Sequence, residues 1–290
     1  MNLPIAFTRA QALKAGVAWS TLRGPHFTRL WHDVYTAGDP DDPVIRLHAA
    51  LVSAGPQSSL CGPTALAWFG VDLPDRLRLD PRLHVHTPGG HPIRLPHLRV
   101  HRDHRLLAPI VRRGLPCTPP AEAWFQLADE ATTHELVVVA DALMRRKRPL
   151  VTPDDLREVV DLAPARRHGR ALAREALGLA RPNTESVPET LTRLVVVQGG
   201  LPCPEVDYPI RNAAGQVVFR LDMAYPERRL GLEYDGAVHV GDTAQMERDQ
   251  WRRRVLEDAG WRLITVTAAD LRGHPHELLT SIRRAWASRT

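Results

Sequence analysis

Acidic side chains gather in two neighbouring segments near the carboxyl end of the chain. Asp222 lies in one run of alternating apolar and polar residues, and Glu233 and Asp235 lie two residues apart in the next. Side chains alternate between the faces of a strand, so Glu233 and Asp235 share a face. Clustered carboxylates repel one another, and a divalent cation relieves that repulsion. Oxygen ligands suit Mg²⁺ or Mn²⁺, and such an ion can promote cleavage of a phosphodiester.

Two further residues extend this constellation. Glu189 lies on the polar side of the preceding predicted helix and is a candidate fourth acid, although it is also the third residue of a capping box that begins at Ser186. His239 follows Asp235 by four residues, where an imidazole can transfer a proton near neutral pH. A histidine on the surface with no catalytic role is the alternative.

A predicted helix after the acids carries a group of arginines. Arg248, Arg252 and Arg253 lie on it, with Asp249 between them. Cationic side chains on one helix can contact the phosphates of a nucleic-acid backbone. The alternative is a solvated helix face on which Asp249 pairs with Arg252 or Arg253.

The acids require a pair of strands to bring them together. The segments 217–224 and 229–234 predict an antiparallel hairpin with its turn at 225–228. Its apolar side chains are expected to share one buried face, and they are Phe219, Leu221, Met223, Leu230, Leu232 and Tyr234. A helix from Ser186 precedes the hairpin, and a helix over 244–259, a strand over 261–267 and a last helix follow it.

The rest of the chain predicts a mixture of helices and strands. A helix that begins at Thr8, a second from Ser20 and a hairpin over 27–36 are typical of a winged helix-turn-helix. Helices are expected at 44–54, 62–69, 120–128 and 133–145, with strands at 83–87 and 98–101. We therefore predict an α/β (α+β) protein with domains at 1–40, 41–181 and 182–290.

Composition narrows the partner and the compartment. The 290 residues carry a formal net charge of +5 and a pI near 9.5, which favours an anionic partner such as DNA. Three distant cysteines, Cys61, Cys117 and Cys203, support neither a disulfide framework nor a Cys-x-x-Cys zinc site. No signal peptide and no membrane-spanning stretch is predicted, so the expected location is the cytoplasm.

Other reactive side chains lack the context that their chemistry needs. The chain has no Gly-x-Ser-x-Gly motif and no glycine-rich phosphate loop, which argues against triad hydrolases and nucleotide hydrolases. Structural or exposed positions are expected for His97, His101 and His104, because a strand would direct His97 and His101 to one face and His104 to the other. His84 and His86 have same-face spacing, but no cysteine or third ligand accompanies them.

An ordered series of motifs over about the last hundred residues resembles a known family. The motifs are Arg220-Leu-Asp222-Met-Ala-Tyr-Pro226, Leu232-Glu-Tyr-Asp-Gly236 with His239, Arg248-Asp249 with Arg252, and Ala259-Gly-Trp261. They resemble the DUF559 domain, which is related to the very-short-patch-repair (Vsr) endonucleases of the PD-(D/E)XK superfamily. The resemblance implies a restriction-endonuclease-like α/β fold, with a site of Glu189, Asp222, Glu233, Asp235 and His239.

The sequence departs from the superfamily pattern at one position. Asp235 replaces the lysine that usually follows the second acid and that holds or activates the attacking water. The resemblance to the Vsr-like branch implies that His239 takes this role. The first 40 residues resemble, over a shorter stretch, the winged-helix module of AbiEi-type antitoxins; the matching motifs are Gly16-Val-Ala-Trp19, Leu22-Arg23 and Trp31-His-Asp-Val-Tyr35.

Three hypotheses follow for the function. The first is a Mg²⁺- or Mn²⁺-dependent DNA endonuclease in repair or phage defence, with metal on Asp222, Glu233 and Asp235 and DNA on the arginines. The second is a non-catalytic DNA-binding regulator of the antitoxin type. The third is an interaction subunit in a defence system whose catalytic partner is another chain. The partners expected besides DNA are a second copy in a homodimer, or a toxin–antitoxin or defence partner.

Overall fold

Helices and strands are mixed along the whole chain, as the sequence predicts. The computed structural model describes residues 3–88, 95–102, 107–236 and 243–289, and within 243–249 it describes the backbone alone. Its strands form three separate sheets, and the fold class is α+β. No helix of the described chain combines the length and the apolar character that crossing a bilayer requires.

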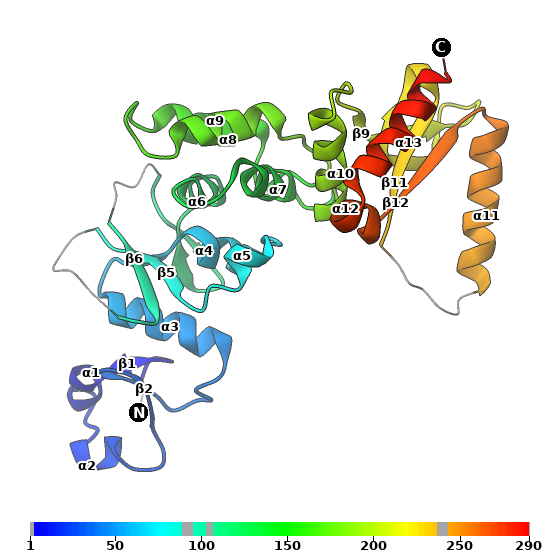
Figure 1. Cartoon of the computed structure of the whole chain (residues 1–290). Coiled ribbons are helices and arrows are strands. Elements are labelled where there is room, and N and C mark those ends of the chain that lie inside the picture. Colours follow the sequence, from blue (N-terminus) through cyan, green and yellow to red (C-terminus); the bar gives the residue numbers. More distant parts are fainter. Residues whose placement is uncertain (1–2, 89–94, 103–106, 237–242, 290) are drawn as a thin grey trace. The chain divides into compact units, whose positions relative to one another are not determined.

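The chain divides into two compact units, coloured along the sequence in Figure 1. The first unit contains Met1–Thr132 and Asp154–Arg174, and the second contains Thr133–Pro153 and Glu175–Thr290. The second unit therefore includes a segment that precedes the predicted boundary at residue 181. The division into three domains stays a prediction.

The first unit opens with a small sheet and two short helices. Thr8 begins the first helix through a capping box, since its hydroxyl accepts from the Gln11 N–H and the Gln11 side chain accepts from the Thr8 N–H. Phe7, Ala12 and Leu22 form the core of this region. Its elements are β1 (Phe7–Thr8), α1 (Arg9–Lys14), α2 (Trp19–Leu22), β2 (Thr28–Trp31) and β3 (Val34–Thr36), in the sheet order β1-β3-β2.

A five-stranded mixed sheet forms the rest of the first unit. The predicted helices at 44–54, 62–69 and 120–128 and both predicted strands are present within one or two residues of their expected bounds. The elements are α3 (Pro43–Ala54), β4 (Ser59–Leu60), α4 (Gly62–Phe69), α5 (Asp75–Arg78), β5 (Leu83–His86), β6 (Leu98–His101), β7 (Ile110–Arg112), β8 (Leu115–Cys117), α6 (Pro120–Leu127) and α8 (Pro153–Leu162). The sheet order is β6-β5-β4-β8-β7, and α9 (Arg170–Leu179) leads into the second unit.

The second unit contains a four-stranded mixed sheet of order β12-β11-β10-β9. The predicted hairpin is confirmed, because β10 and β11 pair antiparallel with Met223 opposite Leu232. A helix then leads to β12, which pairs parallel to β11. The elements are α7 (Thr133–Leu143), α10 (Val187–Gln198), β9 (Glu205–Arg211), β10 (Val217–Tyr225), η1 (Pro226–Arg228), β11 (Leu230–Asp235), α11 (Thr243–Asp258), β12 (Arg262–Thr267), α12 (Ala268–Gly273) and α13 (Pro275–Ala287).

Helices cover both faces of this sheet (Figure 1). Met223 and Leu232 pack with α10 and α13, whereas Leu221 packs with Leu256 of α11. The prediction that Phe219, Leu221 and Met223 share one buried face is therefore wrong. Asp207 of β9 lies between the residues that pair with Leu221 and Met223, and its φ of 52° lies outside the extended range of a regular strand.

The strand β9 had no counterpart in the sequence prediction. Prolines at 202, 204 and 209 break the pattern that a strand would show. In the structure β9 is the edge strand, where Pro209 interrupts no central ladder. Val206, Tyr208 and Ile210 supply the alternating apolar residues that mark it as a strand.

A buried ion pair joins two helices of the second unit. Asp141 of α7 accepts from Arg193 of α10 at 2.6 Å, and each side chain is 1% exposed. The Thr190 hydroxyl donates to the same carboxylate at 2.9 Å, and the Arg181 N–H donates to its other oxygen at 2.7 Å. This bonding compensates the carboxylate for its loss of water.

We predict that Asp141→Asn strongly destabilises the second unit. The substitution leaves the Arg193 guanidinium buried without a counter-charge, a change that typically costs about 3–5 kcal/mol. The control is Glu277→Gln, because Glu277 is exposed and its ion pair is with the exposed His274, so its loss should cost about 0–1 kcal/mol. Urea unfolding followed by circular dichroism measures both, and equal effects would contradict the role given to the buried pair.

Candidate functional site

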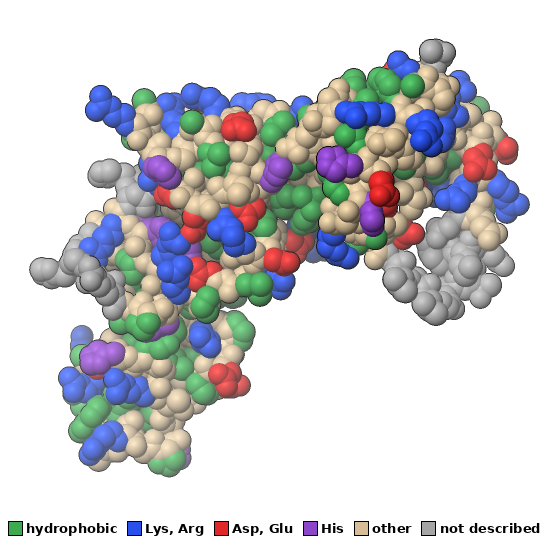
Figure 2. All heavy atoms as spheres, in the orientation of Figure 1, with side chains coloured by type: hydrophobic (Ala, Val, Ile, Leu, Met, Phe, Trp, Pro, Cys, Tyr) green, Lys and Arg blue, Asp and Glu red, His purple; other side chains and the backbone are tan. Residues whose placement is uncertain are grey.

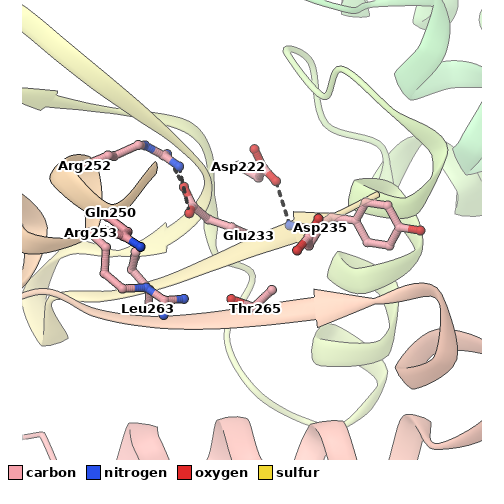
Figure 3. A pocket seen from close by; sticks show the side chains of 9 residues that line it. Asp222, Glu233, Asp235, Gln250, Arg252, Arg253, Leu263 and Thr265 are labelled. Carbon is pink, nitrogen blue, oxygen red and sulfur yellow. Dashed lines mark hydrogen bonds and ion pairs between the residues drawn. The ribbon is translucent and has the colours of Figure 1, made fainter. Parts of the chain in front are cut away.

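The carboxylates predicted to act together lie along the β10–β11 hairpin and at the start of α10. Asp222 and Glu233 line a pocket of about 410 Å³, together with Asp235, Arg252 and Arg253. One Asp222 oxygen accepts from the Tyr234 N–H at 2.8 Å, which fixes the carboxylate beside β11. Figure 3 shows Glu233 directed toward Arg252 and Asp222 directed toward the Tyr234 nitrogen.

Burial makes the charged forms of three carboxylates unfavourable. Desolvation raises the pKa of Asp222, of Glu233 and of Glu189 above the ordinary carboxyl range. The Asp222 charge adds to this effect by raising the pKa of both glutamates. The three acids therefore form one electrostatically coupled group, and a positive charge placed among them would be bound favourably.

Arg252 of α11 supplies one such charge. Its guanidinium holds both oxygens of Glu233, one of them at 3.0 Å. It also donates to the carbonyl of Arg220 at 2.9 Å and lies over the Phe219 ring. This charge lowers the pKa of Glu233 and that of Asp222, against the effect of burial.

Ser186 caps α10 as predicted, but Glu189 accepts from the Ser186 hydroxyl and the Glu185 N–H, not from the Ser186 N–H that a capping box uses. The Ser186 hydroxyl donates to one Glu189 oxygen at 2.8 Å, and the Glu185 N–H donates to the other at 2.9 Å. These bonds occupy both oxygens, yet the Asp222 charge still raises the pKa of Glu189. Glu189 thus fixes the start of α10 and adds negative charge near the hairpin acids.

The other predicted site residues are placed unequally. Asp235 is exposed at the end of β11 and Arg253 is exposed on α11, and both line the pocket. His239 lies outside the described residues, and so does the side chain of Arg248. Within the described part of the chain, no three His, Cys, Asp or Glu side chains are arranged closely enough to form a metal centre.

Asp207 is a residue of this region that the sequence analysis missed. It raises the pKa of Asp222, and its carboxylate binds Arg220 at 2.6 Å and Arg146 at 3.1 Å. Because β9 was not predicted, Asp207 had no assigned position. The alternating Val206, Tyr208 and Ile210 were the available signal, since they place Asp207 on the polar side of a strand.

Two histidines of the first unit lie closer together than the sequence analysis expected. His84 Nδ1 lies 3.1 Å from His101 Nε2, because β5 and β6 pair in parallel. Burial lowers the pKa of His84 to about 3, so its ring is neutral at physiological pH. The expected structural role of these residues agrees with this arrangement.

Comparison with known proteins identifies two relatives over nearly the whole chain. They are "Uncharacterized protein MT2308" and "Uncharacterized protein Rv2248", from two strains of Mycobacterium tuberculosis, CDC 1551 and H37Rv. Each is 32% identical over 263 residues, a match that covers 88% of this chain and 91% of the relative. Neither a family model nor a solved structure matches the chain. The chain belongs to the same family as these two mycobacterial proteins.

Proposed function

We propose that the protein is a metal-dependent DNA endonuclease of the DUF559 and Vsr-like type. The observation that carries the proposal is the acid group: Asp222, Glu233 and Glu189 are partly buried with pKa values raised by desolvation, and the first two line a pocket that Arg252 and Arg253 also line. Folding alone would avoid this arrangement, whereas chemistry on a phosphodiester makes use of it.

The donor atoms at this site fit a hard divalent cation such as Mg²⁺ or Mn²⁺. All of them are carboxylate oxygens, and one Asp222 oxygen has no partner among the described residues. Asp222 and Glu233 would hold the ion, and Asp235 would complete its ligands from the end of β11. Glu233 would have to exchange its two bonds to Arg252 for the cation.

The residues of the chain divide the work in this proposal. The bound cation would polarise the phosphodiester and lower the pKa of a water. The Tyr234 N–H keeps Asp222 oriented, and the Ser186 hydroxyl and Glu185 N–H keep Glu189 near it. Arg253, with Arg248 and a released Arg252, would bind phosphate oxygens. His239 would transfer the proton, because Asp235 replaces the usual lysine.

A specific observation favours the second candidate, a DNA-binding regulator without catalytic activity. Arg252 neutralises Glu233 through both of its oxygens, and the described residues contain no assembled metal centre. An acid that is paired in this way can be structural. The two candidates differ in one measurable property, which is metal-dependent cleavage.

The setting that we propose for either candidate is the cytoplasm, with duplex DNA as the partner. The first 40 residues would serve as a winged helix of the AbiEi type, because a capped helix, a short second helix and a hairpin follow one another there. Repair and phage defence both fit a nuclease of this kind, and a second copy or a defence protein is a compatible partner.

We predict that Asp222→Asn and Glu233→Gln each lower cleavage of supercoiled plasmid in Mg²⁺ or Mn²⁺ by at least about 10²–10³-fold, as does the loss of one group that stabilises developing charge. DNA affinity in EDTA should change little, because both residues act through the cation. The matched control Glu277→Gln should cleave normally. Wild-type cleavage by either site variant would refute the nuclease, and DNA binding without cleavage by the wild type would favour the regulator.

The raised pKa values predict a pH-dependent stability of the metal-free protein. The stability that protonated Asp222 contributes is fully present below the ordinary Asp pKa of about 3.9 and is lost as the pH rises through the raised value. We therefore expect Asp222→Asn, which cannot ionise, to gain stability relative to the wild type as the pH rises from about 4 through the raised pKa of Asp222. Urea unfolding in EDTA across this range measures the difference. Parallel pH profiles for the two proteins would contradict a buried carboxyl at this position.

A further inference from the structure

A basic segment of the second unit lies beside the acid site and has no role in the proposal so far. It runs from Arg146 to Arg148, Arg-Lys-Arg, directly after the end of α7, and all three residues are exposed. In the view of Figure 2, Lys and Arg side chains are spread over both units, so net charge alone does not locate an anion-binding surface. The local contacts of this segment do locate one.

Two acids hold the segment in place. Arg146 Nε lies 3.1 Å from Asp207 Oδ2 and 3.9 Å from Glu185 Oε1. The backbone N–H of Lys147 donates to the same Glu185 oxygen at 3.1 Å. Behind the segment, the Asn183 N–H donates to the Met144 carbonyl at 3.0 Å. A loop that is fixed through side chain and backbone keeps its charges in a defined position.

The same two acids adjoin the candidate site. Asp207 raises the pKa of Asp222, and Glu185 donates its N–H to Glu189. Arg146 therefore neutralises the charges next to the site, whereas the side chains of Lys147 and Arg148 make no ion pair with any described residue. These two cations make no ion pair within the described residues and lie next to the partly buried acids. They are therefore available to bind the phosphates of a polyanion that approaches the acids.

We propose that Lys147 and Arg148 form a phosphate-binding surface that holds the backbone of duplex DNA next to the acid site. The proposal rests on the proposed function, since it assigns the same substrate to the same site. Arg146 is the anchor in this arrangement, with Asp207 and Glu185 as its fixed partners. The segment Arg146–Arg148 thereby adds phosphate contacts to those proposed for the arginines of α11.

The test is duplex DNA binding by the full chain in EDTA, measured by fluorescence anisotropy across a series of salt concentrations. The logarithm of the affinity falls linearly with the logarithm of the salt concentration, and each phosphate that the protein neutralises makes this slope steeper by about 0.9. We expect Lys147→Ala/Arg148→Ala to reduce that slope by about 0.9 for each phosphate that the variant no longer neutralises, and to weaken binding at low salt. The charge-conserving Lys147→Arg/Arg148→Lys should keep the wild-type slope.

The control is Arg272→Ala/Arg284→Ala, which removes two exposed charges from α12 and α13 of the same unit. An unchanged slope in the Lys147/Arg148 alanine variant, an equal reduction in the control, or no DNA binding by the wild type would overturn the proposal. Cleavage plays no part in this measurement. A wild type that binds through this surface but never cuts would refute the nuclease and leave the surface standing.

Discussion

The buried pair of Asp141 and Arg193 is the constraint on which the second unit depends. It joins α7 to α10 through two side chains that are each 1% exposed. Removal of either charge would leave the other buried without a counter-charge. The end of α7 leads into the basic segment, and the start of α10 carries Glu189. This pair, together with the bonds of Asp207 and Glu185 to the basic segment, therefore sets where the cations and one of the acids stand relative to each other. The Thr190 hydroxyl and the Arg181 N–H make the arrangement specific, because the same carboxylate orients both.

The β10–β11 hairpin carries partly buried acids and also contributes side chains to the hydrophobic core. Leu230 and Leu232 of β11 enter the core under α10 and α13, while Glu233 points to the opposite face. Gly231 lies between them, and a Cβ there would meet Leu263 at 2.8 Å and Leu221 at 3.0 Å. The ends of the Leu221 and Leu263 side chains therefore fill the space that a side chain at Gly231 would take. The sheet face that carries the acids thus also carries the apolar side chains Leu221 and Leu263.

The local pattern of the sequence predicted most of the helices and strands of the second unit. The elements and contacts that it did not predict have physical causes. The hairpin, the Ser186 cap and the helices were readable because each depends on neighbours in sequence. The strand β9 was hidden by its prolines, which an edge position tolerates. Asp207 was missed with it, and so was its left-handed backbone conformation. The pairing of Arg252 with Glu233 was also unpredicted, because it spans 19 residues and depends on how α11 packs.

The two central acids are satisfied to different extents, and this asymmetry bears on how the site can respond to a ligand. Glu233 has a counter-charge in Arg252, whereas Asp222 accepts a hydrogen bond from one backbone N–H. Burial and the charge of Asp207 raise the pKa of Asp222. A cation that enters would gain most at Asp222, where no bond has to be broken first. If Glu233 also bound the cation, the Arg252 guanidinium next to the pocket would be released. Binding of a positive charge and exposure of another for phosphate would then be coupled through one carboxylate.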